Sequence, residues 1–133
     1  MTYYKAVIGD KIFELDIYEN KDKIFLESKK IKSVLSNKCK ILKRIHNEHS
    51  FIEPTYKDIV IDLYKEEHLI WSITIKKTEM FKKYMENSPN KLLQVKETSS
   101  DSSMSFTVLL NLKTHIYTYD ELPISNISFV LKI

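Results

Sequence analysis

The chain has 133 residues, of which 43% are apolar and 29% are charged, and its formal net charge is +3. This composition is too apolar for a disordered chain, and the length suits one core, so we expect a single domain over residues 1–133. Gly9 is the only glycine, which excludes Walker loops, dinucleotide fingerprints and nucleophile elbows, because each needs several glycines.

The amino-terminal residues predict a β-hairpin. Residues 3–8 and 11–18 form two strand-like runs, and Gly9-Asp10 between them is a suitable two-residue turn. In the second run, three apolar residues alternate with acidic ones, namely Phe13, Leu15 and Ile17. This alternation indicates one buried and one solvated face.

Residues 24–47 allow two interpretations. As a helix, the segment places Ile31, Val34, Leu35, Ile41, Leu42 and Ile45 on one stripe, although Lys38 falls inside that stripe. As an alternative, the chain turns at Ser36-Asn37 and residues 38–45 form a strand. We favour a helix at least through Leu35.

The centre of the chain predicts a second hairpin and then a helix. Residues 56–64 and 69–76 alternate apolar and polar side chains on either side of a polar turn at 65–68. A helix is expected from Thr78, as its cap, to Asn87. Ser88-Pro89-Asn90 follows and ends it.

The remaining strands are expected at residues 91–97, 105–112, 115–119 and 127–133, with the serine-rich residues 98–105 as a mobile hairpin loop. Several alternating strands with short turns and few helices indicate an α+β fold. We therefore predict a strand-rich, mainly antiparallel sheet of about seven or eight strands, with one or two helices on one side or end. The terminal strands are candidate sheet edges, through which a homo-oligomer could form.

Several features bear on location and origin. Cys39 is the only cysteine, the amino terminus lacks a signal-peptide pattern, and no apolar run is long enough to span a membrane. We therefore expect a cytoplasmic protein, or one of the host cytosol if it is viral. Twenty of the 21 basic residues are lysine, which is typical of an AT-rich genome such as that of a low-GC bacterium or a large DNA virus.

The strongest candidate site is a basic segment. Residues 29–46 carry seven basic and no acidic side chains, and residues 21–50 hold a net charge of +6. Such a surface could bind a phosphate backbone, an acidic protein or anionic lipid, or it could simply be solvated. The candidate binding residues are Lys29, Lys32, Lys40, Lys43 and Arg44.

No catalytic or metal constellation emerges from the sequence. His46 and His49 lack a third ligand at a suitable spacing, and Cys39 is too distant from His46 for a direct hydrogen bond along a helix. Asp58 and Asp62 lie too far apart along a strand to act on one bond. We predict no cofactor and no metal.

The sequence thus favours a non-enzymatic interaction protein that binds a macromolecular partner, as inhibitors, immunity proteins and host-interaction factors do. An unidentified protein is the leading candidate partner. The alternative is a nucleic-acid-binding module that uses residues 29–46, to which exposed tyrosines could add stacking platforms. An enzyme is a third hypothesis, and it would need a pocket that sequence spacing does not reveal.

Overall fold

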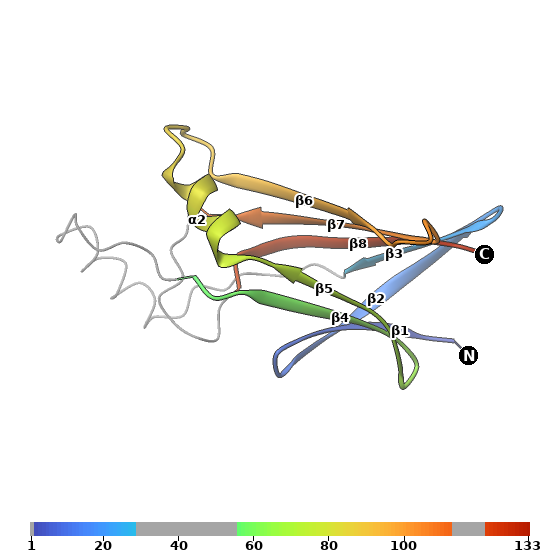
Figure 1. Cartoon of the computed structure of the whole chain (residues 1–133). Helices are drawn as coiled ribbons and strands as arrows, with labels where there is room; N and C mark the ends of the chain where they lie inside the picture. Colours follow the sequence, from blue (N-terminus) through green and yellow to red (C-terminus); the bar gives the residue numbers. More distant parts are fainter. Residues whose placement is uncertain (1, 29–55, 113–121) are drawn as a thin grey trace.

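The computed structural model describes residues 2–28, 56–112 and 122–133. Within these ranges the chain forms eight strands and one helix (Figure 1). In chain order they are β1 (Tyr4–Ile8), β2 (Lys11–Asn20), β3 (Lys23–Ser28), β4 (Ile59–Lys65), β5 (His68–Ile75), α2 (Lys77–Met85), β6 (Leu92–Thr98), β7 (Met104–Asn111) and β8 (Ile124–Lys132). The prediction of a strand-rich α+β fold is confirmed.

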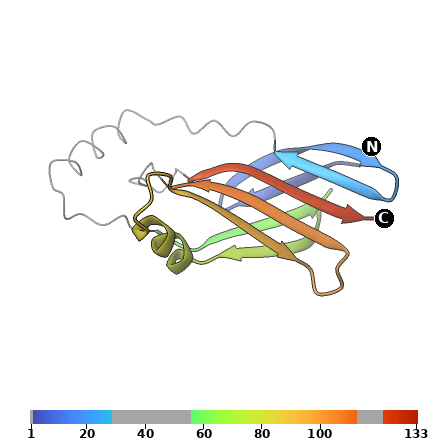
Figure 2. The same ribbon diagram turned by 90° about the horizontal axis from the view of Figure 1, so that it is seen from above.

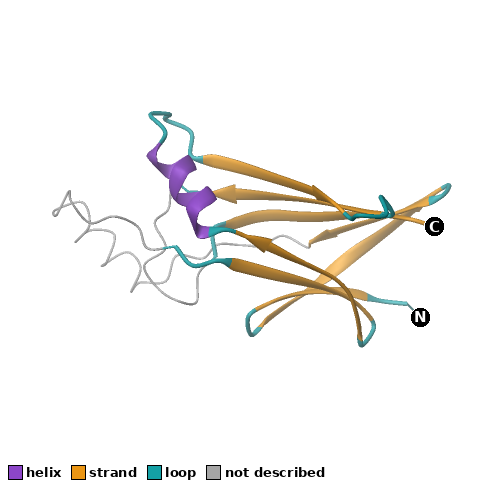
Figure 3. Cartoon of the chain, in the orientation of Figure 1, coloured by secondary structure: helices purple, strands orange, loops and turns teal. Residues whose placement is uncertain are grey.

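All strands join one sheet in the order β5-β4-β1-β2-β3-β8-β7-β6, and every neighbouring pair is antiparallel. The sheet is curled and barrel-like rather than flat, which the sequence did not predict (Figure 2). Helix content is low, and α2 lies at one end of the sheet (Figure 3). Within the described residues, no helix has the length and apolar character needed to cross a membrane.

Strand β2 connects the two halves of the sheet because it changes partner along its length. Its first part pairs with β1 as far as Glu14, and its second part, Leu15–Asn20, pairs with β3. Leu15 is buried at this change of partner. The long strand therefore belongs to both halves, and the curl of the sheet brings their inner faces together.

The core lies between these inner faces. Trp71 on β5 contacts the rings of Phe106 on β7 and Phe129 on β8, at centroid distances of 6.3 and 6.2 Å. The two phenylalanine rings are themselves 5.0 Å apart. Edge-to-face rings at such distances add stability beyond their buried area. This aromatic cluster joins strands that are distant in the order of the sheet.

Helix α2 connects the two edge strands, β5 and β6, and covers one end of the core with Met80, which is fully buried. It begins one residue before Thr78, so the predicted threonine cap is wrong. Instead, Asp58 Oδ1 accepts a hydrogen bond of 2.8 Å from the backbone N–H of Lys77. A carboxylate distant in sequence thus satisfies a donor in the first turn.

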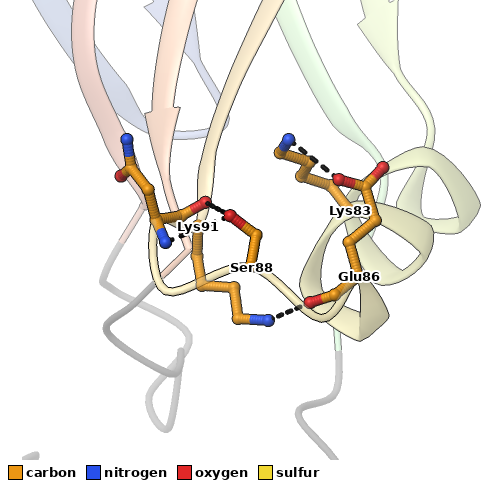
Figure 4. A network of polar contacts seen from close by, with 5 residues as sticks. Lys83, Glu86, Ser88 and Lys91 are labelled. Carbon is orange, nitrogen blue, oxygen red and sulfur yellow. Dashed lines mark hydrogen bonds and ion pairs between the residues drawn. The ribbon is translucent and has the colours of Figure 1, made fainter.

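The carboxyl end of α2 is tied to the chain that follows it (Figure 4). Lys83 Nζ donates to Glu86 at 2.9 Å, and Lys91 Nζ donates to the backbone oxygen of Glu86. Ser88 and Asn90 exchange hydrogen bonds within the next turn. The predicted end at Asn87 is two residues late, because the helix already ends at Met85.

Two expectations about the sheet are wrong. Residues 23–28, most of which fell in the segment favoured as helical, form strand β3, where Leu26 faces the core. The terminal strands are not edges: β1 lies between β4 and β2, and β8 lies between β3 and β7. The edges are β5 and β6 instead. The helix-or-strand alternatives for residues 29–47 and the strand at 115–119 lie outside the described residues.

Three of the hairpins close through two-residue turns whose first residue has a positive φ. These residues are Gly9, Lys21 and Glu66, with φ values of 62°, 56° and 56°. Glycine adopts this conformation without a steric penalty, whereas a side chain is strained there. The predicted turn at Gly9-Asp10 is confirmed, and the other two turns form without glycine.

We expect Lys21→Gly to raise the free energy of unfolding by about 0.5–1 kcal/mol, because relief of the left-handed strain exceeds the entropy that glycine adds to the unfolded chain. Asp22→Gly is the matched control, since its φ is not positive. It should lower stability by about 0.5–1 kcal/mol. Urea unfolding followed by circular dichroism measures both. Equal effects of the two substitutions would contradict the assignment of strain to Lys21.

We expect Trp71→Ala to lower the free energy of unfolding by about 3 kcal/mol, because it removes the ring contacts to Phe106 and Phe129. Leu69→Ala, on the same strand but exposed, should change it by less than about 0.5 kcal/mol. Chemical denaturation of the three proteins tests the difference. A small effect of Trp71→Ala would show that the cluster does not hold the two halves together.

Candidate functional site

The basic residues singled out from the sequence, Lys29, Lys32, Lys40, Lys43 and Arg44, all lie outside the described residues. So do Cys39, His46, His49 and His115. The described residues carry thirteen lysines and fourteen carboxylates, a net charge of −1. The basic excess of the chain therefore belongs to residues whose placement is not described, and a different surface stands out in the rest.

That surface is a groove on the hairpin formed by β2 and β3. Its volume is about 310 Å³, and it is lined by Asp16, Ile17, Tyr18, Asn20, Phe25 and Glu27. The hairpin extends from the end of the sheet opposite α2, close to the carboxyl terminus (Figure 1). The backbone N–H of Ile133 donates to the carbonyl of Asp22 at 2.7 Å, which ties that terminus to the turn of the hairpin.

Cross-strand pairing explains how the side chains of the groove come together. Tyr18 is paired with Phe25, and Asp16 is paired with Glu27. Because residues two apart on a strand share a face, both pairs lie on the face opposite buried Leu26. The rings of Tyr18 and Phe25 are 6.1 Å apart and inclined at 45°. An aromatic pair and an acidic pair thus lie side by side on the outer face.

The groove is unusually apolar for an outward face. Tyr18 is 65% exposed on this face, whereas Ile17, the partner of Leu26, points to the other face of the hairpin and is 41% exposed there. Phe25 is half-buried, and its neighbour on β8, Val130, is half-buried on the same face. Tyrosine and phenylalanine on a surface are the residue types enriched in protein interfaces. A purely solvated strand would not need them.

The strand that carries Tyr18 also has an open edge. Pairing of β2 with β1 ends at Glu14, and among the strands that the structure describes the segment Leu15–Asn20 pairs with β3 alone. Backbone donors and acceptors on the other side of this segment face away from the sheet. An extended chain added there could form main-chain hydrogen bonds while its side chains reach the groove.

A signal for this site was present in the sequence but was missed. Tyr18 and Phe25 are equidistant from the turn at Lys21-Asp22, as are Asp16 and Glu27. Had this turn been predicted, the two strands beside it would have placed Tyr18 opposite Phe25 and Asp16 opposite Glu27. The turn lacks the glycine that marks the turn at Gly9-Asp10, although Asp22 is itself a turn-favouring residue.

A second polar cluster lies at the turn between β4 and β5. The hydroxyl of Tyr3 donates to Glu67 at 2.6 Å, and Lys5 Nζ lies 3.5 Å from the same carboxylate. The hydrogen bond raises the pKa of Tyr3, and together with Lys5 it lowers the pKa of Glu67. The backbone N–H of Glu66 also donates to the carbonyl of Tyr3. The cluster fastens the amino-terminal residues to this turn, which is a structural role.

Two carboxylates, Asp58 just before β4 and Asp62 within it, also have structural partners. Asp58 interacts with the first turn of α2, and Asp62 accepts a hydrogen bond of 2.6 Å from the hydroxyl of Ser72 on β5. In the ranges that the structure describes, no group of three or more histidine, cysteine, aspartate or glutamate side chains is placed to hold a metal. Tyr56 is buried, so it is not one of the exposed tyrosines that could stack on the bases of a nucleic acid.

The serine-rich segment forms the predicted hairpin loop, between β6 and β7, and it is held by Asp101. Oδ1 of Asp101 accepts hydrogen bonds from the hydroxyl and backbone N–H of Ser103 and from the hydroxyl of Ser99, at 2.6, 3.0 and 2.7 Å. These donors favour the charged carboxylate and lower the pKa of Asp101 to about 2.

With this geometry in hand, comparison of the chain with known protein families, with curated proteins and with solved structures finds no significant match. The function of the groove is therefore argued from the side chains that line it.

We expect the Asp101 carboxyl to titrate with a midpoint of about 2 in the folded protein, well below its ordinary value of 3.8. A carboxyl with a lowered pKa stabilises the fold above the unfolded value, and this stabilisation is lost as the pH falls from 3.8 towards 2. Two-dimensional NMR of the carboxyl carbons measures the midpoint directly. Ser103→Ala should move it upwards by removing the leading donor. A midpoint near 3.8 in the unmodified protein would contradict the hydrogen-bonded loop.

Proposed function

We propose that this protein is a non-enzymatic interaction protein, and that it binds a protein partner through the outer face of the β2–β3 hairpin. The observation that carries the proposal is the exposed aromatic pair of Tyr18 and Phe25 in a groove beside an open strand edge. Immunity proteins and inhibitors act by presenting a surface of this kind. The single cysteine supports a reducing compartment, such as the cytoplasm, as the place of binding.

The energetics of binding favour the hairpin, rather than the rest of the described surface, as the place where a partner binds. Aromatic side chains bury a large area with few rotatable bonds, so they contribute most of the binding energy in many interfaces. Other exposed apolar residues, such as Ile12, Val60 and Leu69, lie on the other half of the sheet. At the hairpin, a ring pair and a groove coincide with a strand segment that pairs with one described strand.

The proposal predicts that peptides selected for binding use the hairpin. A displayed library of random peptides is panned against the immobilised protein, and the affinities of the selected peptides are measured by fluorescence anisotropy. We expect Tyr18→Ala and Phe25→Ala each to weaken binding at least about tenfold, as loss of an aromatic anchor does. Ile12→Ala is the matched control, because it removes an equally exposed apolar side chain from the other half of the same strand.

Two outcomes would overturn the proposal. Peptides whose affinity is insensitive to Tyr18→Ala would place the binding surface elsewhere, and a panning that enriches no peptide would argue against a peptide-binding surface. Circular dichroism of each variant confirms that it is folded. The outer-face position of Tyr18 makes a loss of fold an unexpected cause of lost binding.

The same anisotropy assay tests the competing hypothesis of nucleic-acid binding through residues 29–46. Labelled single- and double-stranded DNA and RNA replace the peptides, and the salt concentration is varied. Tight binding that weakens steeply with salt, and that is lost when Lys29, Lys32 and Lys40 are changed to glutamate, would favour that hypothesis. Retention of that binding in Tyr18→Ala would assign it to the basic segment rather than to the hairpin.

A further inference from the structure

We infer that the outer face of the β2–β3 hairpin binds an extended segment of the protein partner in which an acidic side chain lies two residues from an apolar one. The inference deepens the proposed function and depends on it. Its basis is the order of side chains along this face, where an aromatic row is followed by a row of groups that can donate to a carboxylate. The apolar side chain occupies the groove, and the acidic one binds beside it.

Pairing of β3 with β8 extends the outer face of the hairpin by one strand. Two rows of side chains cross β2, β3 and β8 there. The first row is aromatic and apolar, and it consists of Tyr18, Phe25 and Val130. The second row is polar and basic, and it consists of Asn20, Lys23 and Lys132. Because residues two apart on a strand share a face, both rows point outward and lie about 7 Å apart.

The two lysines of the second row are opposed like charges. Lys23 and Lys132 are directly opposite each other on β3 and β8, an arrangement that destabilises a strand pair. Both side chains are exposed, and within the described part of the chain neither ammonium group makes an ion pair or a hydrogen bond, with adjacent Asp22 or with any other residue. A carboxylate bound between them would replace the repulsion with two charge-assisted contacts. This row therefore gains from an acidic side chain of the partner.

The first row suits an apolar side chain. The rings of Tyr18 and Phe25 are inclined at 45° with centroids 6.1 Å apart, so they form an angled wall rather than a closed stack. The groove beside them has a volume of about 310 Å³, which is at the small end of the range for ligand sites and suits one side chain. Asn20 lines the same groove and also pairs with Lys23, so the apolar and acidic subsites adjoin.

The distance between the rows sets the spacing of the two side chains in the ligand. In an extended segment, residues two apart point the same way and are about 7 Å apart, which equals the distance between the rows. Asp16 and Glu27 lie on the other side of the aromatic row, so cations are present at one end of this face only. A single acidic residue at that end fits the face, whereas a uniformly acidic segment finds no cation at the other end.

The test uses tripeptide probes with blocked ends, so that a side-chain carboxylate is the only charge in the ligand. Acetyl-phenylalanyl-alanyl-glutamate amide is titrated into the 15N-labelled full chain, and its glutamine analogue is the control of equal shape without the charge. We expect saturable shifts of the hairpin amide signals, with a dissociation constant on the order of millimolar for so small a ligand. The glutamine analogue should bind at least about threefold more weakly, and this difference should shrink as the salt concentration rises.

Variants then assign the two subsites. Lys23→Gln and Lys132→Gln should each lower the preference for the glutamate probe over the glutamine probe, and the double variant should abolish it. Each substitution removes one of two opposed charges, so neither should destabilise the fold. Lys96→Gln is the matched control, because Lys96 is exposed on the same face of the sheet but lies on β6, and it should leave the preference unchanged. Glu27→Gln, at the other end of the face, should not lower the preference, and Tyr18→Ala should weaken both probes alike.

Failure of this inference is distinguishable from failure of the proposed function. Equal binding of the two probes, no saturable shift with either, or a preference for glutamate that persists in the double lysine variant would overturn the acidic subsite. Selected peptides that depend on Tyr18 but lack an acidic residue would overturn it as well, while leaving the proposed function intact. Selected peptides that carry an acidic residue two positions from an apolar one, and that lose affinity with both Tyr18→Ala and Lys132→Gln, would support both.

Discussion

The change of partner along β2 is the constraint on which the rest of the structure depends. One strand is hydrogen-bonded to β1 up to Glu14 and to β3 from Leu15 onwards, so the two halves of the sheet share a continuous backbone. Strands that pass from one sheet to another in this way turn corners in β structures. The inner faces then meet, and Trp71 reaches Phe106 and Phe129 across the core. Because of the same change, β3 is the only described strand that pairs with the second part of β2.

Completion of the sheet requires a connection between its two edges, and α2 provides it. The helix runs from the end of β5 to the start of β6, and Met80 covers the end of the core between them. Polar contacts around Glu86 and Asp58 hold the two ends of the helix. Lys96 and Glu97 on β6 place charges on that edge, which discourages its pairing with other chains. No comparable lysine lies on the Asp16–Asn20 edge of β2, where the aromatic groove is found.

Local sequence patterns predicted most of the strands, because alternation of apolar and polar residues directly reflects burial of one face. They failed where the deciding interaction is not local. The strand at Lys23–Ser28 was missed because its turn has a strained lysine, Lys21, in place of glycine, and because Ile24-Phe25-Leu26 is a continuous apolar run without alternation. The cap of α2 was missed because its acceptor, Asp58, is nineteen residues away. The groove was missed for the same reason as the strand, since its residues meet only through that pairing.

The distribution of charge separates the two functional hypotheses physically. The described residues carry a net charge of −1, and the residues that line the groove include Asp16 and Glu27 and no lysine, so this lining offers a polyanion no cation to bind. Residues 29–46, which carry the basic excess, follow directly after β3 in the sequence. A polyanion that binds this protein would have to bind the basic side chains of that segment. The two hypotheses therefore assign binding to surfaces of different charge. Substitutions at Tyr18 and Glu27 address one surface without altering the charge of the other.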